Sequence, residues 1–181
     1  NRVSDFSSYR AARVKSLFNA ENGCNFDLEA DLDLEGLDWT IGIVVGPSGS
    51  GKTSIGRRIF GSEEYLYDCA KGWPEDRPII DAIAPRGNFD EVTAALASVG
   101  LGNVPAWLRP FRVLSNGEQF RAGLARLVCE RPERVVVDEF TSVVDRQIAR
   151  TAAQAFQKAW RRGNTGGSKV VLLTPHYDIL D

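Results

Sequence analysis

The sequence contains no methionine, a single histidine (His176) and only three cysteines, Cys24, Cys69 and Cys129. The cysteines show no C-x-x-C spacing and have no histidine neighbour, which argues against a zinc site. An odd, widely spaced set also argues against a disulfide framework and favours reduced thiols in a cytoplasmic setting. Because methionine is absent, the sequence does not begin at its own start codon, and we expect a piece of a longer polypeptide.

Strong charge and long apolar runs are missing as well. The net charge is −2, so no overall basic field indicates nucleic acid or an anionic membrane, although local arginine patches leave nucleic acid open. No apolar run reaches the length of a membrane span, and no signal peptide is visible. With 181 residues, of which 43% are hydrophobic, the composition is that of one soluble globular domain with a sizeable core.

A glycine-rich loop is the most informative feature that is present. Residues 46–53 match the pattern G-x-x-x-x-G-K-[ST], and an apolar run at 41–45 precedes them. A helical stretch follows, which gives the strand, loop and helix context that this motif requires. A glycine-rich turn that matches by accident is the alternative. The predicted nucleotide-binding residues are Gly46, Pro47, Ser48, Gly49, Ser50, Gly51, Lys52, Thr53 and Ser54.

The chemistry of this loop indicates a nucleotide and Mg²⁺. Glycines let the backbone curl so that its N–H groups point at a phosphate. The helix N-terminus adds a partial positive charge. Lys52 is placed to reach the β- and γ-phosphates, and the Thr53 hydroxyl is placed to bind Mg²⁺.

A second candidate anion site precedes a helical pattern at 120–129. Ser115 is suited to the N-cap position, and Glu118 three residues later forms a capping box. On one interpretation this segment only caps the helix. On the other, Ser115, Gly117 and the helix N-terminus bind an anion.

A β-branched run at 134–137 ends in two carboxylates, Asp138 and Glu139. The run predicts a buried parallel strand, and open α/β sheets bind ligands at the C-terminal edge of such strands. Asp138 is then placed to hold Mg²⁺ through its water shell, and Glu139 to polarise a water for attack on the γ-phosphate. Surface acids after a strand are the alternative.

The last part of the chain predicts a helix at 146–162 with one buried face, then a buried strand at 169–174. His176 follows that strand at the sheet edge expected for Thr53 and Asp138, so we predict a contact with the γ-phosphate. A structural or surface histidine is the alternative. The helix residues predicted to be buried are Ile148, Ala152, Ala155, Phe156 and Ala159.

The order of these motifs resembles the ATP-binding cassette (ABC) ATPases over nearly the whole chain. Residues 90–102 also resemble the helix and turn before the family signature. The resemblance implies ATP hydrolysis with Mg²⁺, with Glu139 and His176 as the catalytic residues. The matching segments are 46–53 (Walker A), 114–119 (the signature, normally LSGGQ), 135–139 (Walker B), 142–145 (the D-loop, normally SALD) and 174–176 (the switch-histidine loop).

The resemblance also implies that two cassettes dimerise head to tail, with each ATP between Walker A of one subunit and the signature of the other. Ser115 and Gly117 then contact the γ-phosphate in trans, and Asp145 of the D-loop lies at the nucleotide. An aromatic residue upstream of Walker A stacks on adenine in the family. Phe18 is the best placed, with Tyr9 as the reserve, and a core role is the alternative for both.

The chain departs from the family pattern in three places. Asn116 replaces the first signature glycine, and Glu118-Gln119 replaces a plain Gln. No glutamine lies between Walker A and the signature, so the Q-loop Gln, which touches Mg²⁺ in the family, has no direct counterpart; the nearest candidates are at 73–78. The segment between Walker A and the signature is shorter than in transporter cassettes, and the chain ends soon after His176. In these respects it is similar to ABC ATPases fused to a predicted acetyltransferase domain.

We therefore expect an α/β fold of the P-loop NTPase class in one ABC-type domain, 1–181. The expected function is Mg²⁺-dependent ATP hydrolysis coupled to a fused domain or soluble partner of unknown identity. The alternative is the nucleotide-binding subunit of a membrane transporter, and a binding module without turnover is a weaker third. The expected parts are a β-rich subdomain (1–45), the P-loop core (46–72 and 131–181) and a reduced helical subdomain (73–130).

Overall fold

The computed structural model describes residues 8–18, 37–163 and 166–179, which fall into two units, 1–37 and 38–181. In the first unit the structure describes helix α1 (Tyr9–Phe18), which has no buried residue. This helix and strand β1 (Ile41–Val45) are the described elements of the stretch predicted to be β-rich. Residues 19–36 of that stretch lie outside the described residues, so the β-rich subdomain stays a prediction.

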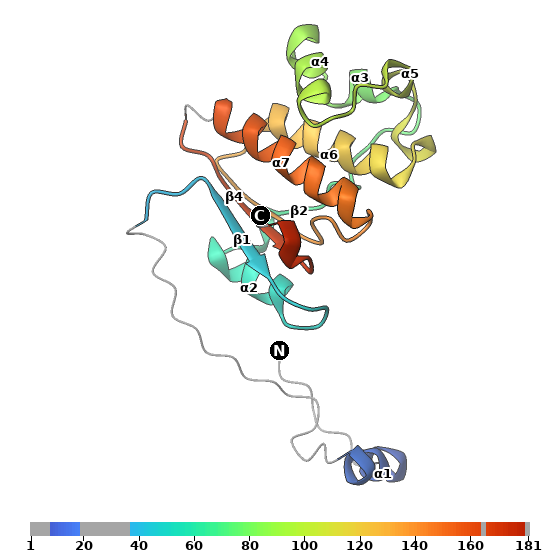
Figure 1. Ribbon diagram of the computed structural model, residues 1–181, viewed down its shortest axis with the longest axis vertical. Coiled ribbons are helices and arrows are strands. Elements are labelled where there is room, and N and C mark those ends of the chain that lie inside the picture. Colours follow the sequence, from blue (N-terminus) through green and yellow to red (C-terminus); the bar gives the residue numbers. More distant parts are fainter. Residues whose placement is uncertain (1–7, 19–36, 164–165, 180–181) are drawn as a thin grey trace. The chain divides into compact units, whose positions relative to one another are not determined.

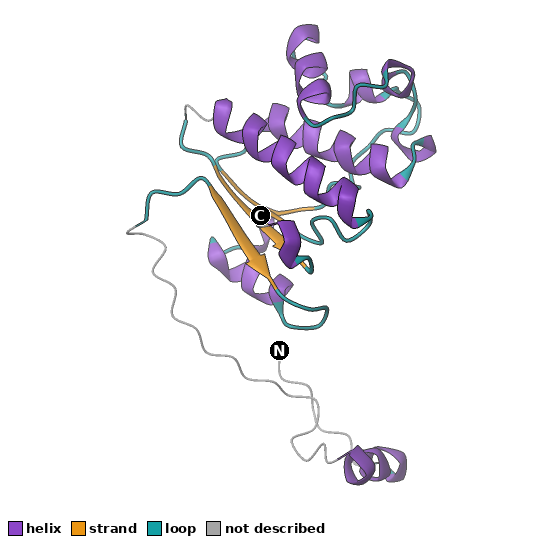
Figure 2. Ribbon diagram, viewed as in Figure 1, coloured by secondary structure: helices purple, strands orange, loops and turns teal. Residues whose placement is uncertain are grey.

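The second unit is built on a parallel sheet of four strands in the order β1-β4-β3-β2 (Figure 2). Three of its strands, β1, β3 (Arg134–Val137) and β4 (Lys169–Thr174), are the three predicted apolar runs. Strand β2 (Leu66–Tyr67) was not predicted, because two residues are too short to show a period.

Helices cover both faces of this sheet. Helix α2 (Lys52–Ile59) lies on one face, and α6 (Asn116–Glu130) and α7 (Arg146–Arg162) lie on the other (Figure 1). Side chains alternate between the two faces along each strand. Val136, Val171 and Leu173 pack on the α2 side, whereas Val135, Val137, Val170 and Leu172 join the core with α6 and α7.

The α2 helix packs directly on strand β4 through a glycine. A Cβ atom at Gly56 would lie 2.6 Å from Leu173 Cδ1 and 3.0 Å from Val136 Cγ1, which leaves no room for a side chain. This contact fixes the helix that follows the glycine-rich loop against the strands that carry the rest of the site.

Between β2 and β3 the described elements are all helical. The short helices α3 (Ile79–Ala82) and α5 (Val104–Trp107) contact each other. The 3-10 turn η2 (Phe111–Val113) and helix α4 (Phe89–Ser98) both contact α6. A further 3-10 turn, η1 (Glu63–Tyr65), directly precedes β2. Another, η3 (Tyr177–Ile179), follows β4. None of the helices in the described ranges is both long and apolar enough to cross a membrane.

Helix α7 has the predicted bounds, but its buried face is rotated from the predicted one. Ala152 and Phe156 are buried as expected, whereas Ile148, Ala155 and Ala159 are only half-buried. The reason is Trp160, the largest fully buried side chain. Because its ring is buried, the face of the helix that contains Trp160 is the face that packs toward the sheet. The residues actually buried are Ala149, Ala152, Ala153, Phe156 and Trp160.

Candidate functional site

Three predicted segments meet at the C-terminal edge of the sheet. Parallel pairing aligns Val45 of β1 with Thr174 of β4, and Val137 of β3 with Leu172 of β4. Beyond the strand ends, Gly46 N donates a hydrogen bond to Thr174 O over 3.3 Å. The glycine-rich loop, the acidic pair and the histidine loop are therefore neighbours, as ligand sites in open α/β sheets require.

The glycine-rich loop leaves the start of helix α2 open. Gly49 and Gly51 have φ values of 80° and 87°, which side chains other than glycine rarely adopt. Gly51 is the N-cap residue of α2, and no side chain accepts a hydrogen bond from the first turn. The first N–H groups of the helix are thus available to an anion.

Lys52 lies under this loop rather than in solvent. Its side chain is buried, with 7% of the residue exposed, and Nζ donates a hydrogen bond to Pro47 O over 3.0 Å. The ammonium group is therefore held where the loop curls, and a phosphate bound by the loop would meet it.

Thr53 and Asp138, the two predicted Mg²⁺ ligands, are in contact although 85 residues separate them in the chain. Thr53 Oγ1 donates to Asp138 Oδ1 over 3.2 Å, and the same carboxylate oxygen accepts from Glu139 N over 2.9 Å. Within the described ranges, no group of three or more His, Cys, Asp or Glu could hold a metal by itself. A hydroxyl and one carboxylate suit Mg²⁺, which keeps several waters and uses substrate phosphates as ligands.

The loop after strand β3 is conformationally strained. Glu139 and Thr141 have φ values of 50° and 72°, and a β-branched residue such as threonine rarely tolerates a positive φ. Strain of this kind persists where the surroundings fix it, and it clusters at functional sites. Here it exposes the Glu139 side chain at the sheet edge while Phe140 between them stays in the core.

Thr141 also positions His176, and this role was missed in the sequence. Its Oγ1 lies 3.0 Å from His176 Nδ1 and 3.0 Å from Thr174 Oγ1, and His176 N donates to Thr174 Oγ1 over 3.1 Å. Thr141 is fully buried and His176 half-buried. The signal was a threonine two residues after Glu139, which local patterns cannot connect to a histidine 35 residues away.

The predicted capping box at the start of α6 is confirmed. Ser115 N and Ser115 Oγ both donate to Glu118 Oε2 over 2.9 Å, and Glu118 N donates back to Ser115 Oγ over 3.4 Å. These hydrogen bonds hold the pKa of the Glu118 carboxyl below its ordinary value. Ser115 is exposed and Gly117 half-buried. An anion-binding role for the pair stays a prediction beside the capping role.

Asp145 has a capping role, and the two aromatic candidates belong to the first unit. Asp145 caps helix α7, because its Oδ1 accepts from Gln147 N and Ile148 N, each over 3.0 Å. Phe18 and Tyr9 lie on α1 in the first unit, where they are 76% and 78% exposed. Stacking on adenine stays a prediction for both.

A small cavity beside the acidic pair contains residues that the sequence did not indicate. It has a volume of about 180 Å³, and Asp68, Cys69 and Ala70 after β2 line it. Residues 73–78, the candidates to replace the Q-loop Gln, do not line it, and their role stays a prediction. Because strand β2 is so short, nothing in the sequence showed that its end lies beside β3. The polar lining residues are Asp68, Cys69, Asn116, Gln119, Asp138 and Glu139.

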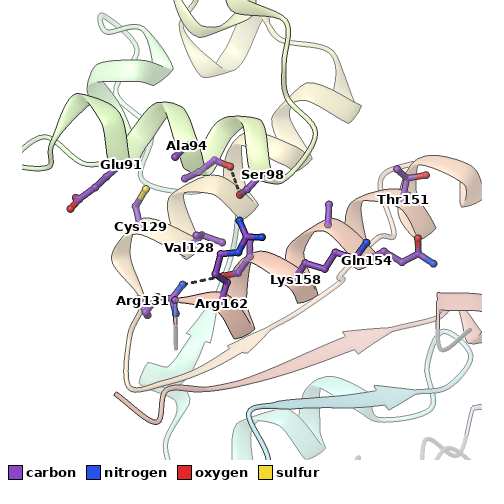
Figure 3. Close-up of a pocket in the computed structure, with 14 residues that line it drawn as sticks. Glu91, Ala94, Ser98, Val128, Cys129, Arg131, Thr151, Gln154, Lys158 and Arg162 are labelled. Carbon is purple, nitrogen blue, oxygen red and sulfur yellow. Dashed lines mark hydrogen bonds between the residues drawn. The ribbon is translucent and has the colours of Figure 1, made fainter. Parts of the chain in front are cut away.

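A larger groove of about 830 Å³ lies elsewhere, between α4, α6 and α7. Figure 3 shows Lys158 and Arg162 of α7 and Arg131 at the end of α6 along it, with Glu91 of α4 among the other lining residues. None of the predicted site residues lines this groove, so the chemistry is assigned to the sheet edge and not to the larger hollow.

Curated proteins similar to this chain are ATP-binding proteins. The chain is 30% identical over 166 residues to the zinc import ATP-binding protein ZnuC of Magnetococcus marinus, which covers 79% of this chain and 62% of that protein. It is 31% identical over 135 residues to the aliphatic sulfonates import ATP-binding protein SsuB 1 of Nocardia farcinica, covering 62% of this chain and 54% of that protein. No protein-family model matches the chain.

Solved structures with the same fold are ABC cassettes. The dimeric structure of the bacterial ABC transporter cassette MJ0796 matches with a TM-score of 0.57 at 16% identity, over 77% of this chain and 76% of that one. The cassette cbiO1 from Clostridium perfringens matches with a TM-score of 0.59 at 14% identity, over 78% of this chain and 69% of that one. In sequence and in fold the chain is similar to the ATP-binding cassette family. Its P-loop NTPase fold and the resemblance predicted from the motif order are both confirmed.

The chain spans only part of the length of these relatives. It spans 62% of the length of ZnuC and 54% of that of SsuB 1. The activities of those proteins are therefore evidence for a proposal only, whereas the similarity in sequence and fold is direct. The closer likeness to ABC ATPases fused to an acetyltransferase domain stays a prediction.

Proposed function

We propose that this cassette binds ATP with Mg²⁺ at residues 46–53 and hydrolyses the γ-phosphate. The observation that carries the proposal is the hydrogen bond of 3.2 Å from Thr53 Oγ1 to Asp138 Oδ1. It joins the helix after the glycine-rich loop to the end of strand β3, and so pairs the two expected Mg²⁺ ligands. A phosphate cradle, a lysine and a metal-binding carboxylate in one place are the parts that this chemistry uses.

Each residue has a distinct role in the proposal. The open start of α2 and Lys52 bind the β- and γ-phosphates, and Thr53 and Asp138 hold Mg²⁺, which neutralises developing phosphate charge. Glu139 orients the attacking water and accepts its proton. His176 contacts the γ-phosphate from the end of the neighbouring strand, and a hydrogen bond between its Nδ1 and Thr141 Oγ1 orients the ring.

The proposal includes a head-to-tail pair of cassettes. In that arrangement Ser115 and Gly117 of one copy complete the site of the other, and Asp145 lies at the shared boundary. Two observations support it: Ser115 is exposed at a helix start, and the cassette MJ0796 has been solved as a dimer. A second structure of that cassette is a post-hydrolysis state bound to ADP and Pi.

Two coupled tasks remain candidates. The sequence favoured a fused domain or soluble partner in the cytoplasm, because the Q-loop Gln is missing and the segment after β2 is short. The names of the relatives favour the other candidate, the nucleotide-binding subunit of a transporter, since ZnuC and SsuB 1 are both import ATP-binding proteins. A further relative, OppF of Lactococcus lactis, is an oligopeptide transport ATP-binding protein.

Phosphate release from ATP in the presence of Mg²⁺ tests the function. We expect Glu139→Gln to lower the rate by roughly 10²–10⁴ while ATP still binds, because the amide keeps the shape but cannot act as a base. Glu133→Gln is the matched control, since Glu133 precedes the same strand at its opposite end and is exposed. Equal rates for the two variants would remove Glu139 from the mechanism, and wild-type protein that does not bind ATP would refute the whole proposal.

A further inference from the structure

Arg126, in the middle of helix α6, is a buried cation that no step above uses. Only 8% of the residue is exposed. Its Nε donates to Tyr67 Oη over 2.7 Å and lies 3.3 Å from Glu130 Oε1. The guanidinium carbon also lies 4.6 Å from the centre of the Trp73 ring and 5.3 Å from that of Tyr67. A buried charge is expensive unless it is paired, so this set of contacts fixes the side chain closely.

Apart from Glu130 of the same helix, the partners of Arg126 lie in one turn, residues 67–73, which begins at the last residue of strand β2. Trp73 Nε1 donates to Cys69 O over 2.8 Å, which closes the turn, and its ring stacks on Phe111 with 4.4 Å between the ring centres. Cation–aromatic and aromatic–aromatic contacts of this kind stabilise the packing of the groups that they join. The turn is thereby bound both to α6 and to η2, the 3-10 turn just before Ser115.

Helix α6 is shaped to receive this turn. A Cβ atom at Gly123 would lie 2.6 Å from Cys69 Cβ and 3.1 Å from Cys69 O, so only glycine lets the helix and turn approach so closely. Burial in this contact raises the pKa of the Cys69 thiol to about 12. Burial likewise raises the pKa of the Tyr67 phenol, against the opposing effect of Arg126.

The same turn forms a wall of the cavity at the site. Strand pairing aligns Tyr67 with Val137, so Asp68 and Asp138 directly follow the ends of two neighbouring strands. Asp68, Cys69 and Ala70 line the cavity of about 180 Å³ together with Asp138 and Glu139. The position of the turn therefore sets the volume of the cavity beside Glu139.

We propose that Arg126 is a positioning residue for hydrolysis: it clamps the turn 67–73 to helix α6 and so fixes the cavity in which Glu139 orients water. The inference rests on the proposed ATPase function. Arg126 touches no nucleotide-binding residue, and β2 is separated from β1 by two strands in the sheet order. Loss of the clamp should accordingly lower kcat and leave ATP affinity unchanged.

Arg131, the C-cap residue of the same helix, supplies a matched control. It too lies over a tryptophan, 5.3 Å from the centre of the Trp160 ring, and Nη1 donates to Trp160 O over 3.0 Å. It faces the groove shown in Figure 3 and not the cavity beside Glu139. The same substitution at the two arginines therefore separates positioning from simple packing.

The test measures kcat and ATP affinity for Arg126→Met and Arg131→Met, at a temperature at which both are folded by circular dichroism. We expect Arg126→Met to lower kcat about tenfold with ATP affinity unchanged, and Arg131→Met to keep kcat within about twofold. Equal losses in the two variants, or a loss of ATP affinity in Arg126→Met, would overturn the proposal.

Tyr67→Phe keeps the inference testable if Arg126→Met does not fold. This change removes only the hydroxyl that accepts from Arg126 and keeps the ring. We expect kcat to fall about threefold, with ATP affinity and the melting temperature close to wild type. A fully active Tyr67→Phe protein, together with a fully active Arg126→Lys protein, would overturn the clamp.

Alkylation of Cys69 gives a readout that does not need hydrolysis. At pH 8 the native thiol should react slowly with iodoacetamide, and Arg126→Met should speed its labelling at least about tenfold, measured by peptide mass spectrometry. Cys129, whose thiol pKa burial raises to about 11, is the internal reference and should not change. Unchanged Cys69 labelling in Arg126→Met would show that Arg126 does not hold the turn.

The two readouts together separate the inference from the proposed function. Faster labelling with unchanged kcat would show a structural contact only, and would overturn the positioning role. A wild-type protein that binds ATP but never releases phosphate would overturn the proposed hydrolysis, and the positioning role with it, before any variant is compared.

Discussion

Helices α2 and α6 both begin at a loop of serine and glycine residues, and both starts were predicted to bind phosphate, but they differ in what the first turn already holds. The N-cap of α2 is Gly51, and no side chain accepts a hydrogen bond from its first turn. The N-cap of α6 is Ser115, and the Glu118 carboxylate accepts hydrogen bonds at this helix start. The start of α2 is therefore open to an anion, whereas the start of α6 already binds the carboxylate of Glu118.

The difference comes from two positions rather than from composition. A glycine N-cap has no side chain to reach back, whereas serine at N-cap and glutamate three residues later satisfy each other. The third residue of the first turn is Ser54 in α2 and Glu118 in α6. A phosphate that approaches α2 meets free N–H groups and Lys52, while a phosphate that approaches α6 from a second copy must share the first turn with Glu118.

The largest effect that tests this comparison is expected for Lys52→Ala. The lysine places a positive charge at the open start, so its loss should lower ATP affinity about 100-fold or more while the domain stays folded. A titration with ATP measures the affinity, and a thermal melt checks the fold. Lys158→Ala, at an exposed lysine of α7 away from the site, is the control. Wild-type affinity for Lys52→Ala would mean that the loop does not bind the phosphates.

Ser115→Arg tests whether the closed start acts in a second copy. We expect this variant to bind ATP as a monomer but to lose dimer formation and turnover, because the arginine blocks the approach of another cassette. A capping role alone predicts a different result: a helix weakened by about 1 kcal/mol, with activity lost only as the fold is lost.

Mixing Ser115→Arg protein with Lys52→Ala protein separates these two outcomes. In a head-to-tail heterodimer, one site carries both changes and the other carries neither. Partial recovery of ATPase activity in the mixture supports action in trans. No recovery, with both proteins folded and associated, would leave Ser115 as a cap or show that the two sites must act together.

A glycine at each helix start provides a smaller, matched pair of substitutions. Gly51→Ala should cost about 1–2 kcal/mol of stability, because φ at Gly51 is 87° and a Cβ is strained there. Gly117→Ala should be neutral or slightly stabilising, since its Cβ would lie at an ordinary 3.5 Å from Ile148 Cδ1 inside a helix. Chemical denaturation measures both, and equal costs would contradict the difference between the two starts.

Glu118→Gln should have the smallest effect and makes the closed start more like the open one. Without the negative charge, a phosphate from the second copy should be accepted more easily, and we expect turnover to rise about threefold. Stability should fall by only a few tenths of a kcal/mol. Glu91→Gln, an acid in the first turn of α4, is the control, and a turnover below wild type would show that the carboxylate does not compete.

The pH dependence of this variant follows from the lowered pKa of Glu118. A carboxyl whose pKa is depressed in the folded state stabilises the fold above its unfolded pKa, and this stabilisation is lost as the pH falls through the folded value. The stability difference between wild type and Glu118→Gln should therefore persist above the ordinary value of 4.5 and shrink below it. Melting curves between pH 3 and 7 measure it.

Local patterns predicted the parts of this protein that a few neighbouring residues decide. The bounds of β4 and α7, the capping box at Ser115 and the glycine-rich loop followed from period, cap chemistry and the motif. The buried face of α7 was wrong in three positions. A period shows that a helix has an apolar stripe, but the largest side chain in contact with the sheet, Trp160, decided which stripe is turned inward.

By itself the sequence determined which functional groups and local motifs are present: a glycine-rich phosphate loop, an acidic pair at a strand end, a capped helix and one histidine. Only the tertiary structure decided which of these groups meet. Parallel register placed Thr53 beside Asp138 and Thr141 beside His176. The unpredicted strand β2 brought the turn at 67–73 to the same edge, where Arg126 holds it. These contacts join residues 35 to 85 positions apart, and such pairs depend on strand order and packing, which no local pattern encodes.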